Sequence, residues 1–161
     1  MKPGKSISLK EAIVKAQNIC AEQEKCEYDI RKKLYDWKLP LTDHDAIIES
    51  LLKDNFIDEK RYAQFYAKDK FYFNKWGKIK IEYTLKQKNI SSENINNALA
   101  EIPEIDYHNL LENELIKKIK TLKDKDEYTI KSKLIRFAIS RGFENGKIFD
   151  MVSTIIEKYY K

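Results

Sequence analysis

Apolar residues recur along this chain every three or four positions, in segments that polar or turn-forming residues separate. Such spacing predicts amphipathic helices. The first stripe follows Ser8, which forms the pattern of a capping box with Glu11. Two further stripes follow Asp58 and Asp106, which are favourable N-cap residues. The stripes are Ala12, Ile13, Ala16, Ile19 and Cys20; Tyr62, Phe65, Tyr66 and Phe73; and Leu111, Leu115, Ile119 and Leu122.

A second and a third helix are indicated after each of these starts. An aliphatic pair four residues apart marks the second helix, and the third helix opens at Thr42, at Ser91 and near Glu144. The chain therefore predicts an all-α fold of about nine helices, in three tandem three-helix repeats stacked into an elongated, curved molecule. The repeats span residues 1–57, 58–104 and 105–161, and the aliphatic pairs are Ile30/Leu34, Ile81/Leu85 and Ile130/Leu134.

Residues 78–86 pose a conflict, because they alternate polar and apolar side chains as a half-buried strand does. The equivalent segment of the first repeat, residues 29–34, has a helical pattern, and no partner strand with hairpin punctuation is visible. We therefore predict a helix here. Just before it, Trp76 is expected to cover a turn in which Gly77 adopts positive φ.

Composition supports a helical protein and narrows its class. The 161 residues include only four glycines and three prolines, which is little turn material for an all-β protein. The longest apolar run is far shorter than a membrane span, and the N-terminus lacks the apolar region of a signal peptide, so a cytoplasmic protein is expected. Cys20 and Cys26 do not have the spacing of a zinc pair and are expected to be reduced thiols, at least one of them packed.

Charge is distributed in bands along the chain. Between Lys60 and Ile90, nine basic residues oppose two acidic ones, and eight aromatic residues lie among them. Residues 115–141 form a second basic band with a net charge of +6, whereas residues 42–59 and 91–114 carry −5 and −6. Basic surfaces attract polyanions, of which nucleic acid is the commonest. The acidic bands are interpreted as solvated helix faces.

No enzyme class is indicated by the ionisable residues. Asp58 and Glu59 suit a helix N-terminus, where a cap and a negative charge are favourable, and Arg61 follows within the first turn. His44 and His108 are far apart in sequence, and no phosphate loop, nucleophile elbow or zinc-protease pattern occurs. We expect neither a catalytic site nor a metal or other cofactor.

Residues 56–63 (FIDEKRYA), 75–78 (KWGK) and 88–90 (KNI), together with the Ile81/Leu85 pair, resemble the second unit of the RecX family of bacterial recombination regulators. The family shows an acidic pair, a basic residue, an aromatic and an alanine at the start of its second unit, and then a glycine before a basic helix. In the first unit Cys26 replaces a small polar residue that is more usual there, and the third unit matches more weakly. The other matching segments are residues 24–34 in the first unit and 133–134 and 140–143 in the third.

This resemblance implies a non-enzymatic protein that binds the RecA recombinase. Members of the family lie in the helical groove of the RecA–single-stranded-DNA filament and bridge its protomers. They thereby limit RecA's ATPase, strand exchange and co-protease activities, and so restrain recombination and the SOS response. The resemblance therefore implies RecA filaments and DNA as partners, and we expect the chain to act as a monomer.

Candidate contacts with RecA or DNA are the basic residues that cluster around the second helix of each repeat, together with Arg61 and Trp76. If these helices line one surface, their charges form a ladder facing phosphate or acidic protein. The alternative interpretation is a solvated lysine face, and for Trp76 simple burial rather than base stacking. The candidates are Arg31, Lys32, Lys33, Arg61, Lys75, Trp76, Lys78, Lys80, Lys86, Lys88, Lys131, Lys133 and Arg136.

Two other functions remain open from the sequence. A sequence-specific helix-turn-helix regulator also uses small helical units with basic helices. The basic helices here are rich in lysine, however, and lack the Arg, Asn and Gln set that reads base edges. A metal-dependent nuclease is the third class, and it would need convergent carboxylates that the sequence does not indicate.

Overall fold

The computed structural model describes residues 6–160 and is entirely α-helical over that range, which contains nine helices and no strand. The first and last residues of the predicted repeats, 1–5 and 161, lie outside the described residues. None of the described helices is long and apolar enough to cross a bilayer. The helices are α1 Leu9–Glu22, α2 Glu27–Asp36, α3 Leu41–Lys53, α4 Glu59–Tyr72, α5 Lys78–Gln87, α6 Ser92–Ala100, α7 Glu104–Thr121, α8 Glu127–Ser140 and α9 Asn145–Tyr159.

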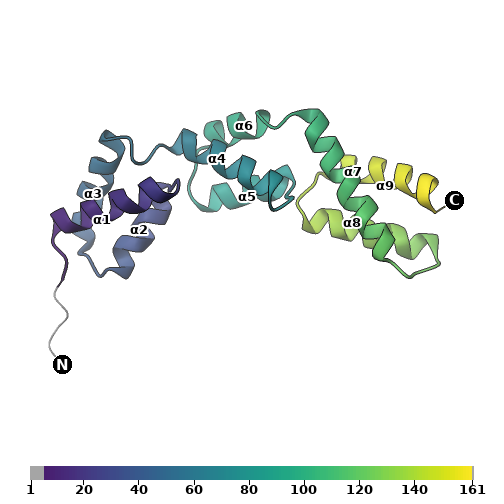
Figure 1. Ribbon diagram of the computed structural model, residues 1–161, viewed down its shortest axis with the longest axis horizontal. Helices are drawn as coiled ribbons and strands as arrows, with labels where there is room; N and C mark the ends of the chain where they lie inside the picture. The colour runs from purple at the N-terminus through teal and green to yellow at the C-terminus, as the bar shows by residue number, and fades with distance from the viewer. Residues whose placement is uncertain (1–5, 161) are drawn as a thin grey trace, which may run out of the picture.

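Consecutive helices pack in threes. We call α1–α3 the first bundle, α4–α6 the second and α7–α9 the third; contacts between helices are extensive within each of them. Figure 1 shows the three bundles in a row, with the two ends of the chain at opposite ends of an elongated molecule. The predicted all-α fold of about nine helices is confirmed. The prediction of a helix rather than a strand over residues 78–86 is confirmed as well, because α5 covers them.

Local sequence sets most helix starts. Ser8 and Glu11 form the predicted capping box, and the side chains of Asp58 and Ser91 accept hydrogen bonds from the third residue of α4 and of α6. Glu144 precedes α9 as expected.

The prediction for Asp106 is wrong. Pro103 holds the N-cap position of α7, so the helix begins two residues before Asp106, and α3 likewise begins after Pro40 rather than at Thr42. Proline has no N–H to satisfy and its fixed φ suits a helix start. The Asp106 carboxylate instead accepts a hydrogen bond from the Tyr72 hydroxyl of α4, at 2.9 Å.

The apolar stripe predicted for α4 is only partly correct. Tyr62 is buried and Tyr66 packs against the core, but Phe65 and Phe73 are 43% and 82% exposed. Their places in the core are taken by two small residues and one aromatic, Ala63, Ala67 and Phe71. Small side chains let α4 approach α6 closely. The prediction missed this face of α4 because it was based on large apolar residues.

The buried residues form two separate cores rather than three. One core lies within the first bundle and is built from residues such as Ile30, Leu34 and Ile47. The other runs continuously through the second and third bundles, from Tyr62 to Ile156. Cys26 is the exception, because it belongs to the first bundle in sequence but is fully buried in the core of the second. The second and third bundles therefore share their apolar packing, whereas the first is attached differently.

Two glycines bring the second and third bundles into contact. The Gly77 N–H donates to the Arg141 carbonyl at 2.7 Å, and the Ile79 N–H donates to the Gly142 carbonyl at 2.9 Å. A Cβ on Gly77 would lie 2.3 Å from the Gly142 carbonyl oxygen. The prediction that Gly77 adopts positive φ is wrong: its φ is −77°, and Lys75 takes the left-handed conformation instead. Gly77 is needed for close approach of two backbones, and Gly142, at φ 90°, for both approach and conformation.

Tyr107 joins the same two bundles through its hydroxyl. The ring is buried between Phe71 of α4 and Phe143. Its hydroxyl donates to the Glu144 carboxylate and accepts a hydrogen bond from the Lys78 N–H, at 3.0 Å, so it satisfies the first backbone N–H of α5.

Tyr107→Phe should therefore lower the free energy of unfolding by about 1–2 kcal/mol, because it leaves a buried N–H and a carboxylate without this partner. Urea unfolding followed by circular dichroism measures the loss. Tyr83→Phe is the matched control, since Tyr83 is 63% exposed and its hydroxyl only accepts from Gln87 on the same helix. Equal effects of the two substitutions would show that the Tyr107 hydroxyl does not stabilise the joint.

Candidate functional site

The second helices α2, α5 and α8 lie on the same side of the molecule. In Figure 1 α2, α5 and α8 lie along the lower side of the molecule, where the C-terminal end of α7 also reaches. Most of the basic candidate residues lie on these helices, and Lys88 directly follows α5. The fold thus places cations from three bundles along one side. The environment of each cation decides how much of its charge is free for a partner.

In the first bundle the three candidate cations differ. Arg31 makes two ion pairs of 2.8 Å, with Glu27 on the same helix and with Asp45 on α3. Lys32 and Lys33 are exposed and have no ion-pair partner within residues 6–160. Arg31 therefore braces α2 against α3, whereas the two lysines present their charge to solvent.

Arg61 and Lys88 form the joint between the first and second bundles. The Arg61 guanidinium donates to Glu24 at 2.6 Å and to the Asn55 carbonyl at 3.0 Å. The Lys88 ammonium donates to Asp29 at 2.7 Å, and these two side chains are only 23% and 19% exposed. Both residues were predicted as partner contacts. The structure instead gives each an internal acidic partner from the first bundle.

The ionisation of this joint follows from its burial. Burial opposes the ionised form of Asp29, but the hydrogen bond and the positive charge of Lys88 outweigh it and lower the pKa of Asp29. Burial raises the pKa of Glu59, whose carboxylate accepts from the N–H of Glu27 at the start of α2. Burial also raises the pKa of the Cys26 thiol to about 12, so this cysteine stays protonated and unreactive while it is packed. Both cysteines are free, as expected.

Lys78, Lys80 and Trp76 lie at the joint between the second and third bundles. The Lys78 ammonium lies 4.8 Å from the centre of the Tyr107 ring and pairs with Glu104 at 3.3 Å. The Lys80 ammonium lies 4.5 Å from the Trp76 ring and has no ion-pair partner among the described residues. Trp76 itself is partly buried against the shared core. Covered in this way, its ring is better suited to packing than to stacking on a base.

The remaining candidates lie on α5 and α8, except for Lys75, which lies between α4 and α5. Three of these lysines are neutralised by a nearby acid: Lys86 pairs with Glu82 at 2.8 Å, Lys131 with Glu127 at 3.5 Å, and Lys133 with Asp124 at 2.7 Å. Lys75 donates to the Tyr72 carbonyl, which leaves its charge uncompensated. Arg136 is exposed and has no acidic partner in the part of the chain that the structure describes.

A groove between α7 and α8 collects cations that include residues absent from the predicted set. It has a volume of about 380 Å³ and is lined by Lys118, Lys133, Arg136, Phe137 and Ser140, and Arg141 lies beside it. Lys118 and Arg141 were missed because they lie outside the second-helix pattern, on α7 and just after α8. The signal that could have found them is the basic band of residues 115–141.

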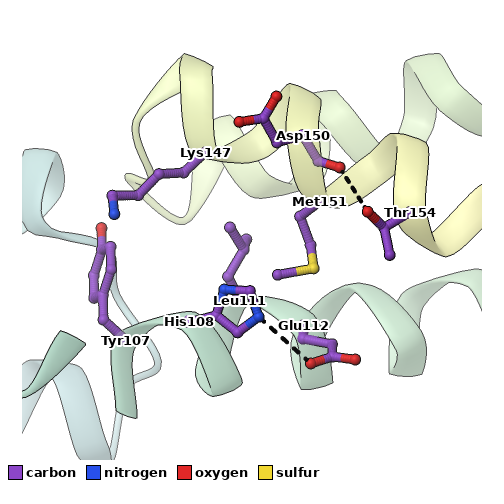
Figure 2. A pocket seen from close by; sticks show the side chains of 8 residues that line it. All are labelled: Tyr107, His108, Leu111, Glu112, Lys147, Asp150, Met151 and Thr154. Carbon is purple, nitrogen blue, oxygen red and sulfur yellow. Dashed lines mark hydrogen bonds and ion pairs between the residues drawn. The ribbon is translucent and has the colours of Figure 1, made fainter. Parts of the chain in front are cut away.

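A second hollow, between α7 and α9, has a different character. Figure 2 shows its lining, in which the apolar side chains of Leu111 and Met151 lie among polar ones. Its volume is about 320 Å³, and His108 and Glu112 on its wall are 3.9 Å apart. Charges of both signs line it, and no group of three metal-ligating side chains occurs among the described residues. It shares no residue with the predicted contacts.

His44, the other histidine, is buried, and its ring nitrogen Nε2 lies 3.2 Å from the Leu39 carbonyl. That contact ties the start of α3 to the turn before it.

Comparison with known proteins places this geometry in a family. Two family models match, described as "RecX, second three-helix domain" over residues 58–99 and "RecX, third three-helix domain" over residues 105–152. The curated "Regulatory protein RecX" of Clostridium botulinum (strain Eklund 17B / Type B) is 35% identical, over 94% of this chain and 74% of its own length. The protein of the same name from Vibrio campbellii is 30% identical, over 92% of this chain and 89% of its own.

Solved structures agree in fold. A crystal structure of regulatory protein RecX superposes with a TM-score of 0.79 at 20% identity, covering 96% of this chain and 83% of that one. RecX from Lactobacillus salivarius gives a TM-score of 0.75 at 19% identity, covering 93% and 95%. The resemblance that the sequence indicated is confirmed. With matching domain models over more than half its length and close curated relatives, the chain belongs to the RecX family of regulatory proteins, a non-enzymatic family associated with the regulation of RecA.

Proposed function

We propose that this protein binds along the groove of the RecA–single-stranded-DNA filament and inhibits RecA, lowering its ATPase, strand-exchange and co-protease activities. It acts without performing a reaction itself, as a monomer in the cytoplasm. Through these activities it restrains homologous recombination and the SOS response.

The observation that supports this proposal best is the row of second helices. Three bundles present α2, α5 and α8 on one side of an elongated molecule (Figure 1). Basic residues lie on or next to each of these helices. A long surface with recurring positive charge is suited to binding a polymer whose phosphates and acidic groups also recur. It is poorly suited to binding one small ligand in a deep pocket. Within this surface, Lys32, Lys33, Lys75, Lys80 and Arg136 carry the uncompensated charge.

A sequence-specific helix-turn-helix regulator receives less support. Its recognition helix would need exposed side chains that read base edges. On α5 the outward polar residues are mainly lysines, and Lys78 and Lys86 are already engaged by acids. Lys80, the lysine of α5 that remains, would contact phosphate, and such a contact is indifferent to base sequence.

Co-sedimentation with preformed RecA filaments tests the proposal. The protein should pellet with filaments at stoichiometric amounts, and DNA-dependent ATP turnover should fall as it is added. Both effects should weaken as salt rises, because charge contacts to a polyanion are screened. Filaments that neither retain the protein nor slow their ATP turnover at modest salt would remove the proposal. A strong preference for one duplex sequence over random DNA would favour the helix-turn-helix alternative instead.

A further inference from the structure

The groove between α7 and α8 differs from the other basic surfaces in having few acids to neutralise it. Lys118, Arg136 and Arg141 have no ion-pair partner among residues 6–160, and only Lys133, at one end, is paired, with Asp124. At the joint between the first and second bundles, by contrast, the cations are held by carboxylates, as Arg61 is by Glu24. Uncompensated charges gathered in a groove sum to a strong local potential, whereas ion pairs largely cancel.

One aromatic ring, that of Phe137, contacts two of these cations. The Lys118 ammonium is 5.3 Å and the Arg141 guanidinium 5.1 Å from the centre of the half-buried Phe137 ring. Contact with the ring face holds both charges beside the groove without neutralising them. The cations are therefore positioned in advance of any ligand, which lowers the entropy that binding would cost.

The positive surface continues from the third bundle onto the second. The Lys80 ammonium of α5 lies 3.5 Å from the carbonyl of Ser140, which lines the groove, and also covers the Trp76 ring. We call Lys80, Lys118, Arg136 and Arg141 the cationic strip. Its members come from α5, α7, α8 and the residue after α8, and the Gly77–Gly142 contact fixes the two bundles that carry them. The fold thus brings these four residues onto one continuous stretch of surface.

We propose that the cationic strip binds successive phosphate groups of a nucleic-acid backbone, and that the paired cations Arg61, Lys78 and Lys88 serve to hold the bundles together. This proposal rests on the proposed function and assigns two different roles to the basic residues of the protein. Guanidinium groups bind phosphate through two parallel hydrogen bonds, and the strip contains two of them. Cations interleaved with aromatic rings are typical of grooves that follow a single strand.

A charge-matched pair of variants tests the strip. Lys118→Gln/Arg136→Gln/Arg141→Gln removes three of its cations. The control, Lys86→Gln/Lys117→Gln/Lys131→Gln, removes three lysines that are paired within their own helices. Both variants lose the same net charge, and all six side chains lie on helix surfaces or beside the groove, so circular dichroism should show unchanged folding.

The measurement is fluorescence anisotropy of a labelled oligo-dT strand at several salt concentrations, without RecA. The strip variant should bind at least about tenfold more weakly than the unmodified chain. Its plot of log affinity against log salt should be shallower by about 2, since each lost phosphate contact on a single strand contributes about 0.7. The control should stay within about threefold of the unmodified chain. Equal losses in the two variants, or no binding by the unmodified chain at low salt, would overturn the proposal.

Two further arms separate the possible causes of failure. Poly-L-glutamate should displace the labelled strand less effectively than unlabelled oligo-dT does. Equal displacement would mean that the strip does not distinguish phosphate from carboxylate groups. The same variants are then added to RecA filaments. If the strip variant loses strand binding while the unmodified chain leaves RecA unaffected, phosphate binding by the strip is supported and inhibition of RecA filaments is refuted. If the unmodified chain inhibits RecA while strand binding is unchanged in the strip variant, only phosphate binding by the strip is refuted.

Discussion

Gly142→Ala should destabilise the protein by about 3 kcal/mol or more, the largest effect that we expect from a single methyl group in this chain. Gly142 has φ 90°, a conformation that side-chain-bearing residues rarely adopt. An added Cβ would also lie 2.2 Å from the Cβ of Lys80 and 2.7 Å from its backbone nitrogen. Because backbone atoms cannot rotate aside, the third bundle must move away from α5.

Urea or thermal unfolding measures this loss, and Gly146→Ala provides the control. Gly146 lies in the first turn of α9, and a Cβ there would meet no atom within 4 Å. Alanine favours a helix over glycine, so the control should be neutral or stabilised by up to about 1 kcal/mol. Equal stability of the two variants would mean that the close approach at Gly142 is not required for folding.

Asp29→Ala should cost about 2 kcal/mol, because it leaves the Lys88 ammonium mostly buried without its carboxylate. Breaking a fully buried pair costs about 3–5 kcal/mol; both side chains here are about one-fifth exposed, and we expect less for that reason. The same carboxylate also accepts from the Cys26 N–H before α2, at 3.4 Å, so a capping contact is lost too.

A double-mutant cycle isolates the pair. Asp29→Ala, Lys88→Ala and the double variant are compared by urea unfolding, and the double variant should be less destabilised than the sum of the singles. Glu82→Ala is a matched control, since it breaks an exposed pair, with Lys86, and should cost less than about 0.5 kcal/mol. Strict additivity of the two single substitutions would show that Asp29 and Lys88 do not interact energetically.

Lowering the pH should change the stability of the joint between the first and second bundles in two opposite steps. The pKa of Glu59 is raised by burial, so its protonation begins above the ordinary pKa of a glutamate and stabilises the folded joint as pH falls. The pKa of Asp29 is lowered mainly by Lys88, so its contribution is complete above the unfolded-state pKa of about 3.9 and is lost as pH falls through the folded value. We expect the free energy of unfolding, measured against pH, to lack the increase at mildly acidic pH in Glu59→Gln. In Asp29→Asn it should lack the decrease at lower pH.

The elements that the sequence predicted are those that depend on neighbours in the chain. The Ser8 and Asp58 caps and the aliphatic pairs of the second helices require only residues within a turn or two, and the structure shows them. Gly77 and Phe73 were interpreted wrongly, because their environments depend on the third bundle and on the small residues of α4. Asp106 was misplaced as a cap because Pro103 takes the N-cap position, so α7 begins two residues before Asp106.

The candidate site was predicted in outline only. Charge and periodicity located the basic second helices. Which cations are neutralised at the joint between the first and second bundles could not be seen, because the partners there are remote in sequence: Glu24 is 37 residues from Arg61, and Asp29 is 59 residues from Lys88. The same remoteness hid Lys118 and Arg141, which approach each other only when α7 packs on α8. These ion-pairing choices are set by tertiary structure, which local patterns do not encode.

The presence of two cores instead of three means that this chain should melt in two pieces. The first bundle is held to the rest by charged hydrogen bonds and by one thiol, Cys26, inserted into its neighbour. Salt weakens these charged hydrogen bonds. Calorimetry at high ionic strength should therefore show thermal unfolding of the first bundle at a lower temperature than that of the second and third bundles. Cys26 should become open to alkylation at the first transition, well before the C-terminal helices lose their structure.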